Sequence, residues 1–198
     1  MKKLTTVLTL VAATVFFAFT APEKKADTYN VDAAKSTIAW NGKKVTGEHT
    51  GNIKFATGSI QFNGKSITGG SLIVDMNSIT CTDITNPDYN AKLVGHLKAD
   101  DFFGTDKFAT AKIDITGSKS LGGDKYEITG NLTIKGITKP ITFPATVKQV
   151  KNALVGAADV TINRTQFDIK YGSASFFNLG DKAINDDFTL KISLVAAK

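Results

Sequence analysis

Apolar and polar residues alternate along most of the chain from Tyr29 onwards. A period of two places one set of side chains on one face of a β-sheet and the other set on the opposite face. The intervening residues are mostly Thr, Lys, Asp, Ser and Asn, as expected of a face in contact with water. The alternation predicts an all-β fold of roughly eight or more short antiparallel strands.

Turn signals divide the alternating runs. Asn-Gly occurs at Asn41 and Asn63, Gly-Gly at Gly69 and Gly122, and Thr-Gly at Thr116. Asn-Gly is the strongest short-range signal for a β-hairpin. A long sheet with one apolar face tends to close or to fold on itself, because closure removes exposed edges. Both a barrel and a sandwich satisfy this pattern.

One segment between the strands has helical periodicity instead. Asn86 can cap a helix and Pro87 suits its first turn. Tyr89, Leu93 and Leu97 follow at spacings of four and form one stripe of a helix. The stripe ends near residue 99, just before an aromatic pair. The pattern predicts a single inserted helix that lies against the sheet.

The N-terminus is typical of an export signal. Two lysines precede an uncharged, largely apolar run that ends at Thr20, which predicts a signal peptide over residues 1–20. An uncleaved membrane anchor is the alternative. We interpret residues 21–28 as a short polar tether and residues 29–198 as one domain. Export would place the protein in the periplasm or outside the cell. Cys81 is the single cysteine, so no internal disulfide can form.

The charge distribution argues against nucleic-acid binding. The formal net charge is +6, and loss of Lys2 and Lys3 with the signal peptide lowers it to +4. The lysines are scattered and Arg164 is the only arginine, whereas nucleic-acid readers concentrate basic residues on one face. The excess positive charge is compatible with transient contact with a membrane surface. The sequence carries no signal for the oligomeric state.

Candidate catalytic groups are few. His49 and His96 are the only histidines, far apart and without HxH or HExxH spacing, so we expect no metal site. A hydrolase that uses His49 or His96 is the enzymatic alternative. Two pairs of aspartates are adjacent in sequence, Asp100–Asp101 and Asp186–Asp187. Neighbouring residues on a strand point to opposite faces, so neither pair is expected to form one catalytic site. Arg164 suits either an anionic headgroup or a structural ion pair with an aspartate.

Several segments together resemble the YceI-like family. They are TYNVDAAKSTIAW, HTGNIKFATGSIQF, HLKADDFFGTDKFATAKIDITG, YEITGNLTIKGITKPITFPATV, INRTQFDIKYG and DDFTLKISLVA. The resemblance covers residues 28–197. It implies a lipocalin-like, extended antiparallel β-barrel of eight strands with a helical insertion. It also implies export to the periplasm, an isoprenoid lipid in an internal apolar channel, and no enzymatic activity. Ala109 stands where the family often has proline.

On this basis we expect an exported protein that binds a long apolar isoprenoid, such as a quinone or a prenyl phosphate, for storage or transport. No cofactor is expected apart from the bound lipid. Arg164 and His49 are the candidates for headgroup contacts, and Lys98, Asp100 and Asp101 are expected to face water or fix the turn. A barrel filled by its own side chains, acting as a stress-related interaction module, is the alternative. The expected channel-lining residues are Ile38, Trp40, Ile53, Phe55, Ile60, Phe62, Leu72, Val74, Met76, Leu97, Phe102, Phe103, Ile113, Ile115, Leu132, Ile134, Phe143, Val160, Ile162, Phe188, Leu190 and Ile192.

Overall fold

A computed structural model describes residues 25–198 of the chain. The predicted signal peptide (1–20) and the first part of the predicted tether lie outside the described residues. The first strand begins at Asp27, inside the segment that was expected to be tether. The elements are β1 (Asp27–Val31), β2 (Thr37–Lys44), β3 (Gly47–Phe62), β4 (Ile67–Cys81), α1 (Pro87–Lys98), β5 (Thr110–Gly122), β6 (Lys125–Ile134), β7 (Ile137–Val150), β8 (Ala153–Asn163), the 3-10 helices η1 (Arg164–Phe167) and η2 (Gly180–Lys182), and β9 (Ile184–Ala197).

The strands form one closed antiparallel barrel. Their order is β1-β3-β2-β9-β8-β7-β6-β5-β4, and β3 also pairs with β4, which closes the eight strands β2–β9 into a ring. The short β1 lies between β3 and β9, in line with β2: Tyr29 pairs with Ile60 of β3, and Asn30 pairs with Ala197 of β9. The prediction of an eight-stranded, lipocalin-like barrel with one inserted helix is confirmed, and the sandwich is excluded.

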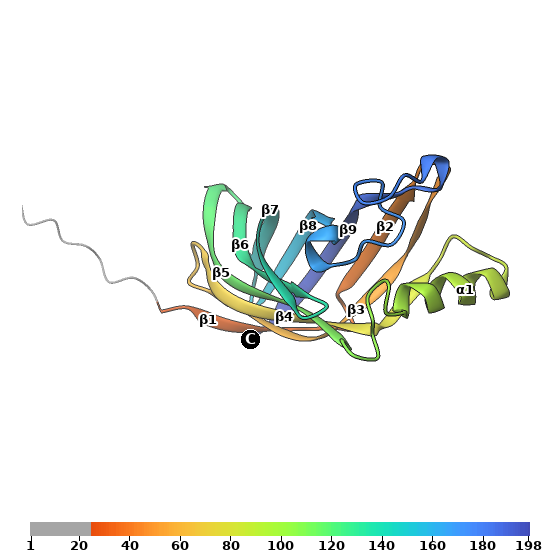
Figure 1. Cartoon of the computed structure of the whole chain (residues 1–198). Helices are drawn as coiled ribbons and strands as arrows, with labels where there is room; N and C mark the ends of the chain where they lie inside the picture. The colour runs from red at the N-terminus through yellow and green to blue at the C-terminus, as the bar shows by residue number, and fades with distance from the viewer. Residues whose placement is uncertain (1–24) are drawn as a thin grey trace, which may run out of the picture.

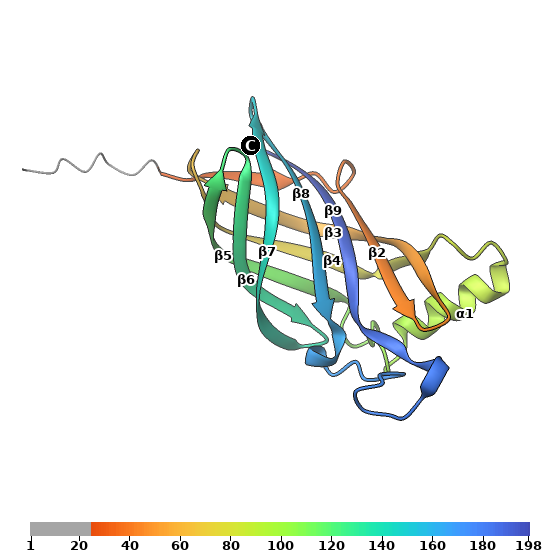
Figure 2. The ribbon, with the colours of Figure 1, turned by 90° about the horizontal axis from the view of Figure 1, so that it is seen from above.

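The two ends of the barrel differ (Figures 1 and 2). One end, here called the helix end, carries the β2–β3 and β6–β7 turns and two long connections, one containing α1 and the other joining β8 to β9. The other end, the hairpin end, carries the short β3–β4, β5–β6 and β7–β8 turns together with the C-terminus. All the long connecting segments therefore lie at the helix end.

The inserted helix begins and ends close to where the sequence predicted. The Asn86 side chain accepts hydrogen bonds from the backbone N–H groups of Asp88 and Tyr89 at 3.0 and 3.1 Å, and Pro87 occupies the first turn. Leu93 and Leu97 pack against the barrel core. The prediction that Tyr89 belongs to the packed stripe is wrong, since this side chain is 67% exposed. No helix within residues 25–198 is long and apolar enough to cross a bilayer.

Of the two Asn-Gly turn signals, one marks a turn between strands and the other lies inside a strand. The Asn63 side chain accepts backbone hydrogen bonds from Lys65 and Ser66 and so organises the β3–β4 turn. In contrast, Asn41 lies inside β2, where the strand register shifts just beyond it. Glycine occurs at bulges as well as at turns, so glycine-containing dipeptides mark both.

The hairpin end is filled by the protein's own side chains. Tyr29, Leu154 and Ala196 are fully buried there. The Tyr29 hydroxyl accepts a hydrogen bond from the Gln149 amide at 3.0 Å, so the buried phenol has a polar partner. Beside them the Phe62 ring packs edge-on against another tyrosine with centroids 6.4 Å apart. This end of the barrel is therefore a packed core.

Candidate functional site

Between this packed end and the helix end the barrel encloses an apolar cavity of about 290 Å³. Twenty-one of the predicted channel residues line it, namely Ile38, Trp40, Ile53, Phe55, Ile60, Leu72, Val74, Met76, Leu97, Phe102, Phe103, Ile113, Ile115, Leu132, Ile134, Phe143, Val160, Ile162, Phe188, Leu190 and Ile192. The remaining predicted residue, Phe62, does not line the cavity, because it belongs to the packed core at the hairpin end. The alternation thus identifies the inward face but not which part of it borders empty space.

Small residues create much of this space. Ala145 of β7 and Ala158 of β8 are register partners and both border the cavity, as does Gly156. Near them on β7 and on the adjacent strand β9, inward-facing side chains such as Phe143 and Leu190 remain only half-buried although they lie inside the barrel. These small residues were missed, because an alanine in an alternating strand gives little hydrophobic signal. Other lining residues that the sequence analysis did not select include Ile67, Ile79, Leu93, Ile128, Ile141, Val147, Ile184 and Leu194.

An aromatic cluster covers part of the cavity at the helix end. It consists of His96, Phe102, Phe103, Tyr171 and Phe188, which come from α1, the turn after it, the β8–β9 connection and β9. The ring centroids of Phe102 and Tyr171 are 5.6 Å apart, and those of Phe103 and Phe188 are 6.2 Å apart. The His96 ring stands edge-on to Tyr171 at 4.5 Å. Edge-on and tilted pairs are favoured arrangements of aromatic rings, so these contacts stabilise the cluster.

The turn after α1 is fixed by polar contacts on its outer side. The Lys98 ammonium donates to the backbone carbonyl of Asn77 at 2.8 Å, and the Lys107 ammonium lies 2.6 Å from an Asp100 carboxylate oxygen. The Lys107 hydrogen bond and charge lower the pKa of Asp100. Asp101 lies 3.0 Å from the His96 ring nitrogen Nε2. These charged groups hold Phe102 and Phe103 toward the cavity.

Most of the polar residues that border the cavity lie near the helix end. Exposed Lys43 and Lys44 of β2 and Asn185 and Asp187 of β9 are among its lining residues. Because β2 and β9 are neighbours, these groups lie on one side of the barrel end. The cavity therefore combines apolar walls with a polar rim, the pattern of a site that holds one small molecule in a fixed orientation.

His49 also borders the cavity and is held by an aspartate. Its Nδ1 lies 2.8 Å from a carboxylate oxygen of Asp83, whose other oxygen accepts from the Thr50 backbone N–H at 2.8 Å and from the Cys81 thiol. Partial burial raises the pKa of Asp83, but these hydrogen bonds outweigh it and bring the pKa down to about 2. An ionised Asp83 fixes the orientation of the imidazole at the rim.

The Arg164 side chain is hydrogen-bonded to backbone carbonyls of neighbouring segments of the chain. It is 4% exposed, and its guanidinium donates to the carbonyls of Ile169, Tyr171, Ile184 and Asn185 at 2.8 to 3.1 Å. Asp186 lies 3.5 Å away as a weak ionic partner. The guanidinium also stands over the Phe102 ring at 5.9 Å. Of the two roles considered, the structure supports the structural one: Arg164 fastens the β8–β9 connection to the barrel.

The described residues contain little that suggests catalysis. No group of three or more His, Cys, Asp or Glu within residues 25–198 could hold a metal ion. In the same part of the chain neither histidine is hydrogen-bonded to a Ser, Thr or Cys side chain; each contacts an aspartate. Cys81 is buried, donates its S–H to Asp83, and behaves as a small core residue.

A closed eight-stranded barrel with an apolar interior and a polar rim defines the class of lipocalin-like binding barrels. Residues 29–196 match the YceI-like domain. The chain therefore belongs to the YceI-like family, and the sequence resemblance is confirmed. No curated protein matches the chain significantly.

Solved structures share the fold. BcnA from Burkholderia cenocepacia is 25% identical, with a TM-score of 0.68 over 84% of this chain and 99% of that chain. A polyisoprenoid binding domain from Saccharophagus degradans, implicated in plant cell wall breakdown, is 16% identical, with a TM-score of 0.62 over 85% of this chain and 97% of its own. The Campylobacter jejuni YceI protein is 19% identical, with a TM-score of 0.56 over 100% and 99% of the two chains.

Proposed function

We propose that this protein is an exported, non-enzymatic carrier that holds the tail of a long isoprenoid lipid, of the quinone or prenyl phosphate type, in the barrel cavity. The observation that carries the proposal is an apolar cavity of about 290 Å³ with most of its polar lining residues at one end. The Saccharophagus domain described as polyisoprenoid binding has the same fold and supports this class of ligand. No cofactor other than the lipid is needed, and the protein works in the periplasm or outside the cell.

The energetics favour a cavity that is normally occupied. An empty core cavity costs about 24 cal/mol per Å³, so 290 Å³ corresponds to roughly 7 kcal/mol relative to a filled core. Each buried methylene of a ligand gains about 0.8 kcal/mol. A prenyl tail therefore recovers much of this cost without any hydrogen bond in the walls. The same space argues against the alternative of a barrel filled by its own side chains.

The polar rim is where a headgroup would lie. His49, oriented by Asp83, and the ammonium groups of Lys43 and Lys44 can contact the oxygens of a quinone or a phosphate there. Arg164 does not contact the headgroup in this proposal, because its donors already bind backbone carbonyls. Most of the affinity comes from the tail, so the rim selects the headgroup and sets its orientation.

Native mass spectrometry of the protein purified from its native compartment tests the proposal, with organic extraction to identify the released lipid. We expect a bound mass that extraction identifies as an isoprenoid. A bare chain mass, or a lipid without an isoprenoid tail, would contradict the proposal.

A double variant, His49→Ala with His96→Ala, provides the control for the enzymatic alternative. We expect it to retain the bound lipid, because the apolar walls are unchanged. Complete loss of lipid in a folded double variant would mean that the histidines, and not the walls, provide the binding.

A further inference from the structure

Exposed apolar side chains gather at the helix end. Five of the eight large hydrophobic residues that are exposed within residues 25–198 lie there, and they include every exposed aromatic ring of that part of the chain. The five are Val45, Tyr89, Tyr171, Phe176 and Phe177. This is also the end at which the cavity has its polar rim. Single exposed apolar residues need no explanation, but a group beside the polar rim of an apolar cavity does.

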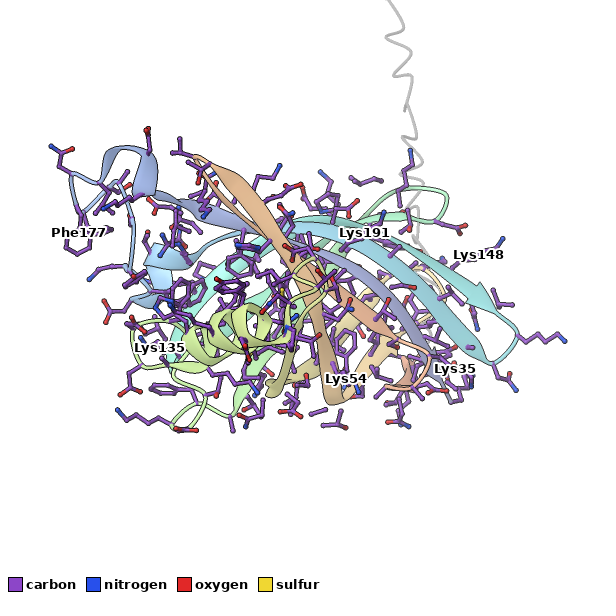
Figure 3. All side chains as sticks on the ribbon, turned by 90° about the vertical axis from the view of Figure 1, so that its right-hand side faces the viewer. Lys35, Lys54, Lys135, Lys148, Phe177 and Lys191 are labelled. Carbon is purple, nitrogen blue, oxygen red and sulfur yellow. The ribbon has the colours of Figure 1, made fainter. Side chains whose placement is uncertain are left out.

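Three of these rings, Tyr171, Phe176 and Phe177, lie on the β8–β9 connection and are here called the aromatic tip. Phe176 and Phe177 are 50% and 51% exposed. Figure 3 shows Phe177 projecting away from the barrel at the edge of the molecule. About half of the surface of these two adjacent rings contacts water, so moving it into an apolar environment would be energetically favourable.

The backbone beneath the aromatic tip is firmly held. Phe176 and Phe177 donate their backbone N–H groups to the carbonyl of fully buried Ser173. The Arg164 guanidinium binds the Tyr171 carbonyl at 2.8 Å, and the Ser175 hydroxyl donates to Asp186. The connection therefore presents its rings outward from a scaffold that is tied to the barrel.

The charges around the aromatic tip are balanced. The Lys170 ammonium lies 5.3 Å from the Phe176 ring centroid and 2.7 Å from an Asp168 carboxylate oxygen. Lys182 and Asp181 add one charge of each sign on the other side of the tip. A zwitterionic phospholipid headgroup likewise carries one charge of each sign. Rings flanked by lysines are the side chains that proteins place at the headgroup level of a bilayer.

We propose that the aromatic tip inserts into the interface of a zwitterionic phospholipid bilayer and brings the helix end, with the polar rim of the cavity, to the membrane. The inference rests on the proposed function, because an isoprenoid tail cannot cross water at useful rates and its carrier must load and unload at a membrane. The ring contact between Tyr171 and Phe102, at 5.6 Å, joins the aromatic tip to the cavity wall. Docking therefore acts on a residue that lines the cavity.

Flotation of the full protein with phosphatidylcholine vesicles tests this inference. We expect wild-type protein to float with the vesicles and Phe176→Ala with Phe177→Ala to lower the partition coefficient by about tenfold or more. Leu121→Ala is the matched control, because Leu121 is 52% exposed at the hairpin end. This control should bind as wild type does. Raising the salt to about 0.5 M should change binding little, since the charges at the tip are balanced.

The outcomes separate this inference from the proposed function. A double variant that loses vesicle binding but still carries lipid by mass spectrometry supports both. Wild-type protein that carries lipid but does not float with vesicles overturns the membrane inference alone. Equal flotation of wild type and the double variant, or an equal loss in the Leu121→Ala control, would also overturn it.

Discussion

A cavity that holds a ligand should also accept a larger side chain introduced by mutation. Ala158 is the best position at which to test this. Ala158 lies on β8, pairs with Ala145 of β7, and borders the cavity. Ala158→Leu adds three carbon groups to the cavity, each worth about 0.8 kcal/mol when buried. The lipid-free variant should therefore gain about 2 kcal/mol in unfolding free energy, or about 4–8 °C in melting temperature for a chain of this size.

The same substitution should weaken lipid binding. The new side chain occupies space that the tail would otherwise fill, so a loss of about 2 kcal/mol corresponds to roughly a 30-fold weaker affinity. The assay is thermal melting of delipidated protein, together with quantification of the lipid extracted from protein purified without delipidation. Thr161→Leu is the matched control, because Thr161 is exposed on the outer face of the same strand and does not line the cavity.

Stability and lipid content should move in opposite directions in Ala158→Leu and stay near wild type in Thr161→Leu. A lower melting temperature in Ala158→Leu would show that the space is not available to a side chain. Unchanged lipid content would show that the tail does not lie against β8. Either result would refute the reasoning.

Three further changes test other parts of the site. Phe102→Ala should lower lipid content more than Asp100→Ala, because Phe102 lines the cavity whereas Asp100 faces Lys107 outside it; the reverse order in extracted lipid would count against this assignment. Arg164→Met should lower the unfolding free energy in urea by about 3 kcal/mol or more, since it leaves buried carbonyls without donors; a loss below about 1 kcal/mol would argue against that role. The pKa of Asp83 is about 2 when folded, against 3.8 ordinarily, so its stabilising contribution should be present above about pH 4 and disappear as the pH falls towards 2. Asp83→Asn should remove this pH dependence of the unfolding free energy, which amounts to at most about 2 kcal/mol because the side chain is partly exposed. An unchanged dependence of stability on pH would contradict the assignment.

The inward face of the barrel was readable from the sequence because its signal is local. Ile38 and Trp40, or Leu190 and Ile192, reveal their shared face by spacing alone. The position of a residue along the barrel axis cannot be read from local spacing, because it depends on segments that are distant in sequence. Phe62 alternates with Ile60 as Phe55 does with Ile53, yet Phe62 packs in the core at the hairpin end, where β1 joins the wall and adds Tyr29.

The cavity exists because some side chains in the barrel wall are small, and a hydrophobic pattern does not reveal where small side chains leave empty space. Ala145 and Ala158 open the space because they meet across neighbouring strands, and strand register cannot be read from either strand alone. The role of Arg164 was undetermined for a related reason. Its carbonyl partners lie on the β8–β9 connection and at the start of β9, whose positions become clear only once the barrel is closed.

The central claim is that the barrel interior holds an isoprenoid tail, and a crystal structure of the lipid-loaded protein tests it most directly. We expect continuous density for the tail between β4–β6 and β8–β9, in contact with Phe143, Ala158 and Leu190, and with the headgroup near His49. An empty or collapsed interior, with the lipid bound on the outside of the barrel, would contradict the claim.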